Sequence, residues 1–262
     1  MNKKSFAVLL LFLFLCACAK EEPVPETAAD TIAAPAETAQ QVSAATAPTV
    51  TLHCEYYHPD YTARQIWTYF EEVILHVEYT NGTGDATLVQ KWTQPIRFRF
   101  FGTPTQEDLA VLNALFAQLN RIHGFHGIRE AAEGETEQLR ISFLEPEVFR
   151  ASYASVVGGE DAVGATEFWY DTDTNEIYSA RIGYRTDLDQ QTRNSILLEE
   201  IVNTLGISDT VLREDSITYQ YSNDNLVLSD VDRILLALLY HPDIRCGMDA
   251  EDCADVIGRL YY

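Results

Sequence analysis

Acidic and amide side chains cluster in one short segment, residues 198–209, which reads LEEIVNTLGISD. Glu199, Glu200, Asn203 and Asp209 offer only oxygen atoms, and one of these is the neutral amide oxygen of an asparagine. Oxygen donors suit hard cations such as Ca²⁺, Mg²⁺ or Mn²⁺, whereas zinc prefers imidazole and thiolate. An isolated pair of glutamates is most often a solvated surface, so the wider context must decide.

Other side chains that could bind a metal or act as nucleophiles are weaker candidates. His123 and His126 form an HxxH in a glycine-containing loop, but neither a cysteine nor a third histidine is nearby, so surface or capping roles are favoured over metal binding. His53 and His58 flank Cys54 and could assist a metal site, although core or surface roles are the default. The chain has no GxSxG motif and no convincing Cys/His nucleophile pair.

Three helices and a sheet are expected to position the acidic segment. Thr105, Asp189 and Ser229 are N-cap residues ahead of apolar stripes, and Gly206 follows the second helix. A further helical apolar pattern covers 61–77. Alternating or apolar runs predict strands over 49–57, 95–101, 139–144, 165–171 and 176–184. The order indicates an α+β fold with a twisted mixed sheet.

The acidic segment resembles the HExxHxxGxxH helix of metzincin zinc peptidases, with each histidine replaced. The resemblance puts Glu199, Asn203 and Asp209 at the three metal-ligand positions, Glu200 at the general base and Gly206 at the turn. The segment 216–219 occupies the place of the Met-turn, with Thr218 in place of Met, and 228–240 resembles the closing helix. The match covers roughly 92–240 and implies a metzincin-like domain with a degenerate site.

The chain is also similar to an uncharacterised bacterial family, domain of unknown function 2927. Its members carry an EExxQ-x-LG helix, a leucine-rich last helix with LY near its end, and a following GM, which Cys246-Gly247-Met248 echoes here. This similarity is closer than the one to active peptidases, but the family is uncharacterised, so the similarity says nothing about activity.

The N-terminus reads as an export signal. Lys3 and Lys4 precede an apolar stretch that is too short to span a membrane, and Leu15-Cys16-Ala17-Cys18 resembles a bacterial lipobox. We therefore expect a signal peptide at 1–17, a lipid-carrying Cys18, and an exported protein anchored in the cell envelope. Because Ala19 after Cys18 is not the aspartate associated with inner-membrane retention in enteric bacteria, we expect the outer membrane, facing the periplasm, in a Gram-negative cell.

Composition divides the rest of the chain. Residues 18–48, rich in Ala, Glu, Thr and Pro, are expected to be a disordered tether, and 49–262 to be the metzincin-like domain, with a sheet and helix subdomain at 49–206 and a helical subdomain at 207–262. The net charge of −22 disfavours nucleic acid as a partner. In an oxidising compartment Cys246 and Cys253 are the expected disulfide, although Cys54 could pair with either.

The expected function follows from this degenerate site. With zinc doubtful and an oxygen-bound divalent cation as the alternative, we expect a non-catalytic domain that binds a peptide or protein in the envelope. In zincins the strand before the last one pairs with an extended peptide, so 165–171, with Phe168 and Tyr170, is the expected docking edge. The rival is a metal-dependent hydrolase with oxygen ligands, in which Glu200 would be the catalytic base.

Overall fold

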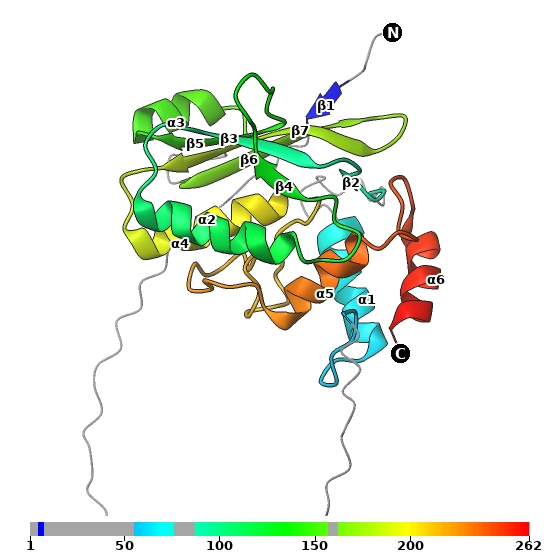
Figure 1. The fold of residues 1–262 in the computed structure, drawn as a ribbon. Helices are drawn as coiled ribbons and strands as arrows, with labels where there is room; N and C mark the ends of the chain where they lie inside the picture. Colours follow the sequence, from blue (N-terminus) through cyan, green and yellow to red (C-terminus); the bar gives the residue numbers. More distant parts are fainter. Residues whose placement is uncertain (1–4, 8–54, 76–86, 157–161, 262) are drawn as a thin grey trace, which may run out of the picture. The chain divides into compact units, whose positions relative to one another are not determined.

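The computed structural model describes residues 5–7, 55–75, 87–156 and 162–261 of the chain. Cys18, Cys54, the expected tether and all but three residues of the expected signal peptide lie outside these ranges. The described part is a mixed α/β fold with a largely parallel sheet and six α-helices (Figure 1). No helix in these ranges is long and apolar enough to cross a membrane.

The sheet has the order β1-β6-β7-β5-β3-β4, with a short β2 beside β7. Strands β3, β4, β5 and β7 run parallel to one another, whereas β6 runs antiparallel to β7 and β1 runs antiparallel to β6. The bounds are β1 Ser5–Ala7, β2 Lys91–Trp92, β3 Ile96–Phe101, β4 Ile128–Glu130, β5 Leu139–Leu144, β6 Gly164–Asp171 and β7 Glu176–Arg185.

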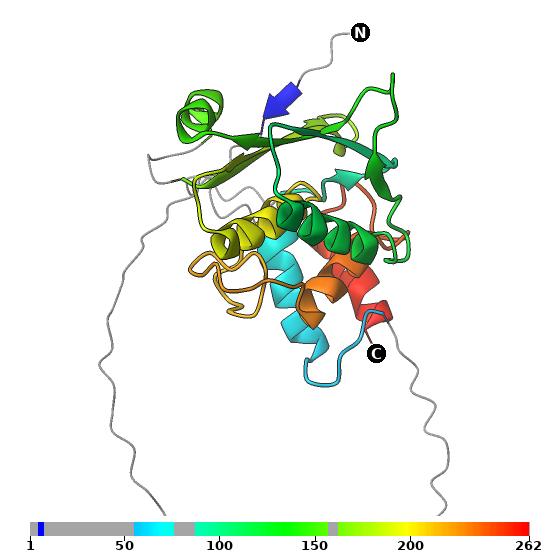
Figure 2. The same cartoon turned by 60° about the vertical axis from the view of Figure 1, so that its left-hand side comes forward.

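The helices cover the two faces of the sheet unequally. Figure 2 shows α2 (Gln106–Leu119) and α4 (Gln190–Asn203) side by side beneath one face, with α1 (Ala63–Phe70), α5 (Asp230–Leu239) and α6 (Ala250–Leu260) beyond them. The short α3 (Pro146–Tyr153) packs on the other face, where the Tyr153 ring lies against Gly183. The main core therefore lies between the sheet and the larger helical layer.

Local capping chemistry explains why three helices begin where the sequence predicts. The hydroxyls of Thr105 and Ser229 accept from the backbone N–H three residues on, and in each case an aspartate at that third position caps in return. The Asp189 carboxylate accepts from the N–H of Thr192 at the start of α4. Each cap satisfies backbone donors that the first helical turn leaves free.

Several elements differ from the expectation. The predicted helix over 61–77 is α1 followed by a π-helical turn, Glu71–Leu75. Elements α3, α6, β1, β2 and β4 had no counterpart in the prediction. The short strands and the eight-residue α3 carry too few apolar repeats to be recognised, whereas α6, with 11 residues, was long enough to predict and was missed. Residues 55–56 form a turn and residue 57 has no regular structure, so neither is the end of the strand predicted over 49–57, whose other residues are not described.

Candidate functional site

Helix α4 carries the acidic segment into the interior. Glu199, Glu200 and Asn203 are 4%, 2% and 0% exposed, so the solvated acidic surface that an isolated EE would suggest is not what forms. Two hydrogen bonds hold the helix in place: the Tyr184 hydroxyl donates to the carbonyl of Leu197, and the Trp92 indole N–H donates to that of Thr204 at 2.8 Å. The polar cluster is thus fixed beneath the sheet.

The turn after α4 brings Asp209 back to the helix. Gly206 has φ +96°, and a Cβ there would lie 2.1 Å from the carbonyl oxygen of Gln90, so only glycine fits. The reversal lets Asn203 Nδ2 donate to Asp209 Oδ1 at 3.2 Å. This is the chain path that the sequence predicted for Gly206, and Asp209 is only 2% exposed.

Glu200 points at the sheet rather than at solvent. The Thr166 hydroxyl, on β6, lies within hydrogen-bond reach of both Glu200 Oε2 and the Glu200 carbonyl oxygen, the latter at 3.1 Å. One hydroxyl proton cannot serve both, so a protonated Glu200 that donates to Thr166 satisfies all three groups. Burial, reinforced by the nearby Asp209 charge, raises the pKa of Glu200 to about 8 against the opposing Thr166 hydrogen bond.

Glu199 has a similar environment. Burial raises the pKa of Glu199 well above its usual range, and the charges of Asp209 and Glu200 act in the same direction. Its neighbour one helical turn on, Asn203, has a buried side-chain carbonyl oxygen without a hydrogen-bond partner in the described part of the chain. A buried acceptor of this kind calls for a proton donor or a cation.

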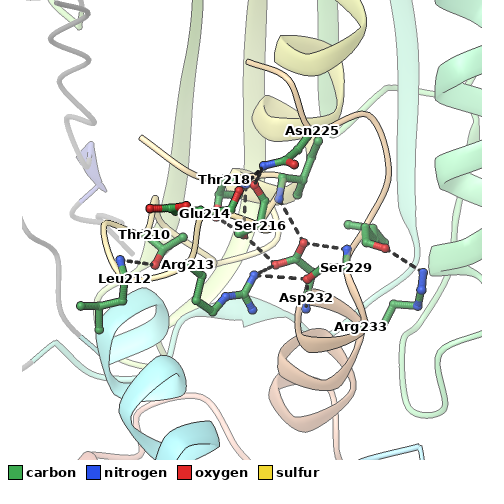
Figure 3. A network of polar contacts seen from close by, with 12 residues as sticks. Thr210, Leu212, Arg213, Glu214, Ser216, Thr218, Asn225, Ser229, Asp232 and Arg233 are labelled. Carbon is green, nitrogen blue, oxygen red and sulfur yellow. Dashed lines mark hydrogen bonds and ion pairs between the residues drawn. The ribbon is translucent and has the colours of Figure 1, made fainter. Parts of the chain in front are cut away.

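A second network of polar contacts joins the segment that follows Asp209 to the start of α5 (Figure 3). The backbone of Thr210, directly after Asp209, pairs with the segment 218–220 through Thr210 N–H to the Thr218 carbonyl at 2.9 Å and Gln220 N–H to the Thr210 carbonyl at 3.0 Å. The turn that the resemblance equates with the Met-turn therefore lies beside Thr210, the residue that follows Asp209. It carries Thr218, which is 2% exposed.

Asp232, at the start of α5, joins this turn to the last helices. Its carboxylate accepts from the Ser216 hydroxyl at 2.7 Å, from the Ile217 N–H at 3.0 Å and from the buried Arg213 guanidinium, as Figure 3 shows. The sequence reading missed the Arg213–Asp232 pair. The S-x-x-D spacing of Ser229 and Asp232 signals a capping box, but nothing local signals the arginine.

The donor set does not fit zinc. All side-chain donors at the replaced ligand positions are oxygens or an amide, and the described residues contain no group of three His, Cys, Asp or Glu side chains that could hold a metal ion. Glu200 is protonated at neutral pH if its pKa is about 8, so it is not poised as a base. The buried carboxyl groups can bind protons, and the Asn203–Asp209 hydrogen bond fixes the turn at Gly206. The Asn203 amide oxygen, which has no partner among the described residues, could coordinate a hard cation.

The expected docking edge needs a correction. Strand β6 lies at the margin of the mixed sheet, and its outer side pairs with β1 through Phe6 and Tyr170 and their neighbours. The Phe168 side chain, however, is 6% exposed and belongs to the main core, and Tyr170 is partly buried against that core. A segment on this edge would therefore meet the β6 backbone rather than the Phe168 ring.

The predicted disulfide is also corrected. Cys246 and Cys253 are both free thiols in the structure. The Cys246 thiol is directed at the carbonyl oxygen of Lys91, with Sγ at 3.6 Å, and Cys253 is buried in α6. Sequence spacing reports only how short the loop is, and it does not determine where two side chains point.

The histidines are not gathered at the acidic cluster. His123 and His126 are both exposed in the loop after α2, and the ring of His58 packs edge-on against that of Tyr61. His53 is outside the described residues. None of them lines the acidic cluster formed by 199–209 in the described structure.

Comparison with known proteins places the chain in a family. No curated protein and no solved structure matches it significantly. The family model described as "Protein of unknown function (DUF2927)" matches residues 63–259, which is well over half of the chain and includes α1 to α5 and all of α6 except its last residue. The chain therefore belongs to the DUF2927 family.

Proposed function

We propose that this protein is a lipid-anchored envelope lipoprotein whose degenerate metzincin-like domain lacks catalysis and holds an extended peptide or protein segment on the outer edge of β6. The observation that carries the proposal is the antiparallel pairing of Ser5–Ala7 with β6. An extended segment of the chain itself thus occupies the edge that the zincin resemblance assigns to a peptide.

The state of the acidic cluster supports the non-catalytic part of the proposal. Glu199, Glu200, Asn203 and Asp209 are buried, and three of them, Glu200, Asn203 and Asp209, are engaged in hydrogen bonds. Hydrolysis would need an accessible water, a Lewis acid and an ionised base at this point. A buried glutamic acid with a raised pKa is a poor base at neutral pH.

The location of β6 supports the binding part. Strand addition uses backbone N–H and C=O groups, and the outer side of β6 supplies them along a strand that spans Gly164–Asp171. Residues 5–7 belong to the segment that we propose is removed at Cys18. After that cleavage the edge is free for a partner in the envelope.

A labelled peptide with the sequence of residues 3–9, KKSFAVL, tests the proposal by fluorescence anisotropy against the protein that begins at Cys18. We expect saturable binding, and weaker binding to the full chain, in which residues 5–7 already occupy the edge. The control is the same peptide with alternate amides N-methylated, which keeps the side chains but removes the donors. Equal binding of both peptides, or no binding, would refute strand addition on β6.

A second candidate function is a metal-dependent hydrolase with oxygen ligands. One observation favours it: the buried Asn203 Oδ1, near Glu199 and Asp209, has no hydrogen-bond partner among the residues that the structure describes. Elemental analysis of the purified protein and a peptide-cleavage assay of wild type against Glu200→Ala separate the two candidates. Stoichiometric divalent metal together with cleavage abolished in the variant would replace the binding proposal with the hydrolase.

A further inference from the structure

A cavity of about 510 Å³ lies away from the acidic cluster, where β2, the turn between β6 and β7, and the segment after α5 meet. Its volume falls within the range of roughly 300–1,000 Å³ that is typical of small-molecule sites. Lys91, Glu176, Arg245 and Cys246 supply polar walls, and Tyr240 and Ile244 supply apolar ones. None of these residues takes part in the proposed peptide site.

Lys91 brings an unusual charge to this cavity. Its side chain is only 6% exposed, and its ammonium donates to the carbonyl oxygens of Leu239, at 2.7 Å, and Ile244. Among the described residues no carboxylate lies within ion-pair distance of it. These carbonyls lie at the C-terminal end of α5 and just beyond it, so they satisfy the ammonium hydrogens and partly offset the charge. No described carboxylate neutralises it, whereas buried charges in proteins are normally paired.

The pKa values of Lys91 and of the two nearby thiols also indicate that the lysine has no negative partner among the residues described. Burial lowers the pKa of Lys91 to about 8, and the groups that oppose this shift are the Cys246 and Cys253 thiols rather than a carboxylate. Burial raises the pKa values of both thiols, so at neutral pH they are uncharged and supply no counter-ion. The lysine therefore lacks a negative partner within the described chain.

A second cation stands at the same cavity. Arg245 is exposed, and its guanidinium forms no ion pair with any described residue, while Glu176 is the one carboxylate in the described cavity lining. Lys and Arg therefore outnumber Asp and Glu by two to one in the cavity lining, whereas in the whole chain 18 Lys and Arg are outnumbered by 40 Asp and Glu. The cavity is thus a locally cationic site on an acidic protein, and such a site attracts anions.

We propose that this cavity binds a small organic anion, whose carboxylate or phosphate group pairs with Lys91 and Arg245 and whose apolar body packs against Tyr240 and Ile244. An inorganic ion alone would leave most of the 510 Å³ unfilled. The apolar wall residues give the remainder of the ligand a surface to bury, and the guanidinium gives its anionic group a planar pair of donors.

Calorimetric titration of the exported protein with three matched probes tests this inference: benzoate, phenyl phosphate and the neutral benzamide. We expect saturable one-to-one binding of at least one of the two anions and at least about tenfold weaker binding of benzamide, since each tenfold step is about 1.4 kcal/mol. The comparison of the two anions identifies the head group that the site prefers. Equal affinity for benzamide, or no binding of any probe, would overturn the proposal.

Two variants complete the test. Arg245→Gln should weaken anion binding by about tenfold without affecting the fold, because its side chain is exposed, whereas Arg259→Gln, an exposed arginine on α6 outside the cavity lining, should have no effect. Lys91→Met should abolish anion binding if the variant folds. If Arg245→Gln and Arg259→Gln bind alike, the cavity is not an anion site and Lys91 serves only to satisfy helix-end carbonyls.

Discussion

Replacing Glu200 by glutamine should remove a pH-dependent loss of stability. In the unfolded chain this carboxyl ionises with a pKa near 4.5, whereas in the folded protein burial raises the pKa to about 8. The folded state therefore binds the proton more tightly. The contribution of the protonated carboxyl is fully present below pH 4.5 and is lost as the pH rises through about 8.

The magnitude follows from the size of that shift. Between pH 5.5 and 7.5 the slope is at most about 1.4 kcal/mol per pH unit, so Glu200 alone can reduce the free energy of unfolding by up to about 3 kcal/mol over this range. Glutamine keeps the shape of the neutral acid, and its amide can donate to the Thr166 hydroxyl as a protonated Glu200 would. Glu200→Gln should therefore match wild type near pH 5 and exceed its stability at pH 7.5.

Urea denaturation at pH 5.5, 6.5 and 7.5 measures this difference. Glu133→Gln is the control, because Glu133 is an exposed loop residue and its replacement should leave the pH profile of wild type unchanged. Subtracting each profile from that of wild type removes the contribution of the other carboxylates. A difference between Glu200→Gln and wild type that stays constant across the three pH values would show that Glu200 is ionised in the fold, which would refute the reasoning.

Two further predictions concern the frame around the cluster. Asp232→Ala leaves the Arg213 guanidinium buried without its partner and should lower the free energy of unfolding by about 3–5 kcal/mol in chemical denaturation. Asp230→Ala, two residues away and exposed, should cost far less. Gly206→Ala forces a Cβ against the Gln90 carbonyl at a positive φ, so it should lower the melting temperature. The same change should expose Trp92 to solvent and increase the quenching of its fluorescence. An unchanged melting temperature would contradict the turn geometry.

The sequence predicted those helices and strands whose capping residues or apolar pattern lie within the element itself. The helices α2, α4 and α5 were predicted with their N-cap residues because Thr105, Asp189 and Ser229 act on backbone groups only three residues away. The strands β3, β5, β6 and β7 were predicted because apolar alternation is itself the pattern of a buried strand face. Gly206 was recognised as the turn for the same reason, since its positive φ is a local property.

The tertiary structure alone decided what depends on distant partners. Glu199 and Glu200 look like a solvated pair in sequence, and only the packing of α4 beneath β6 makes them buried acids with raised pKa values. Lys91 approaches carbonyls about 150 residues away, and Cys246 turns to the Lys91 backbone instead of Cys253. Spacing along the chain determines which side chains share a helix face, whereas desolvation and side-chain direction arise only when separate segments pack together.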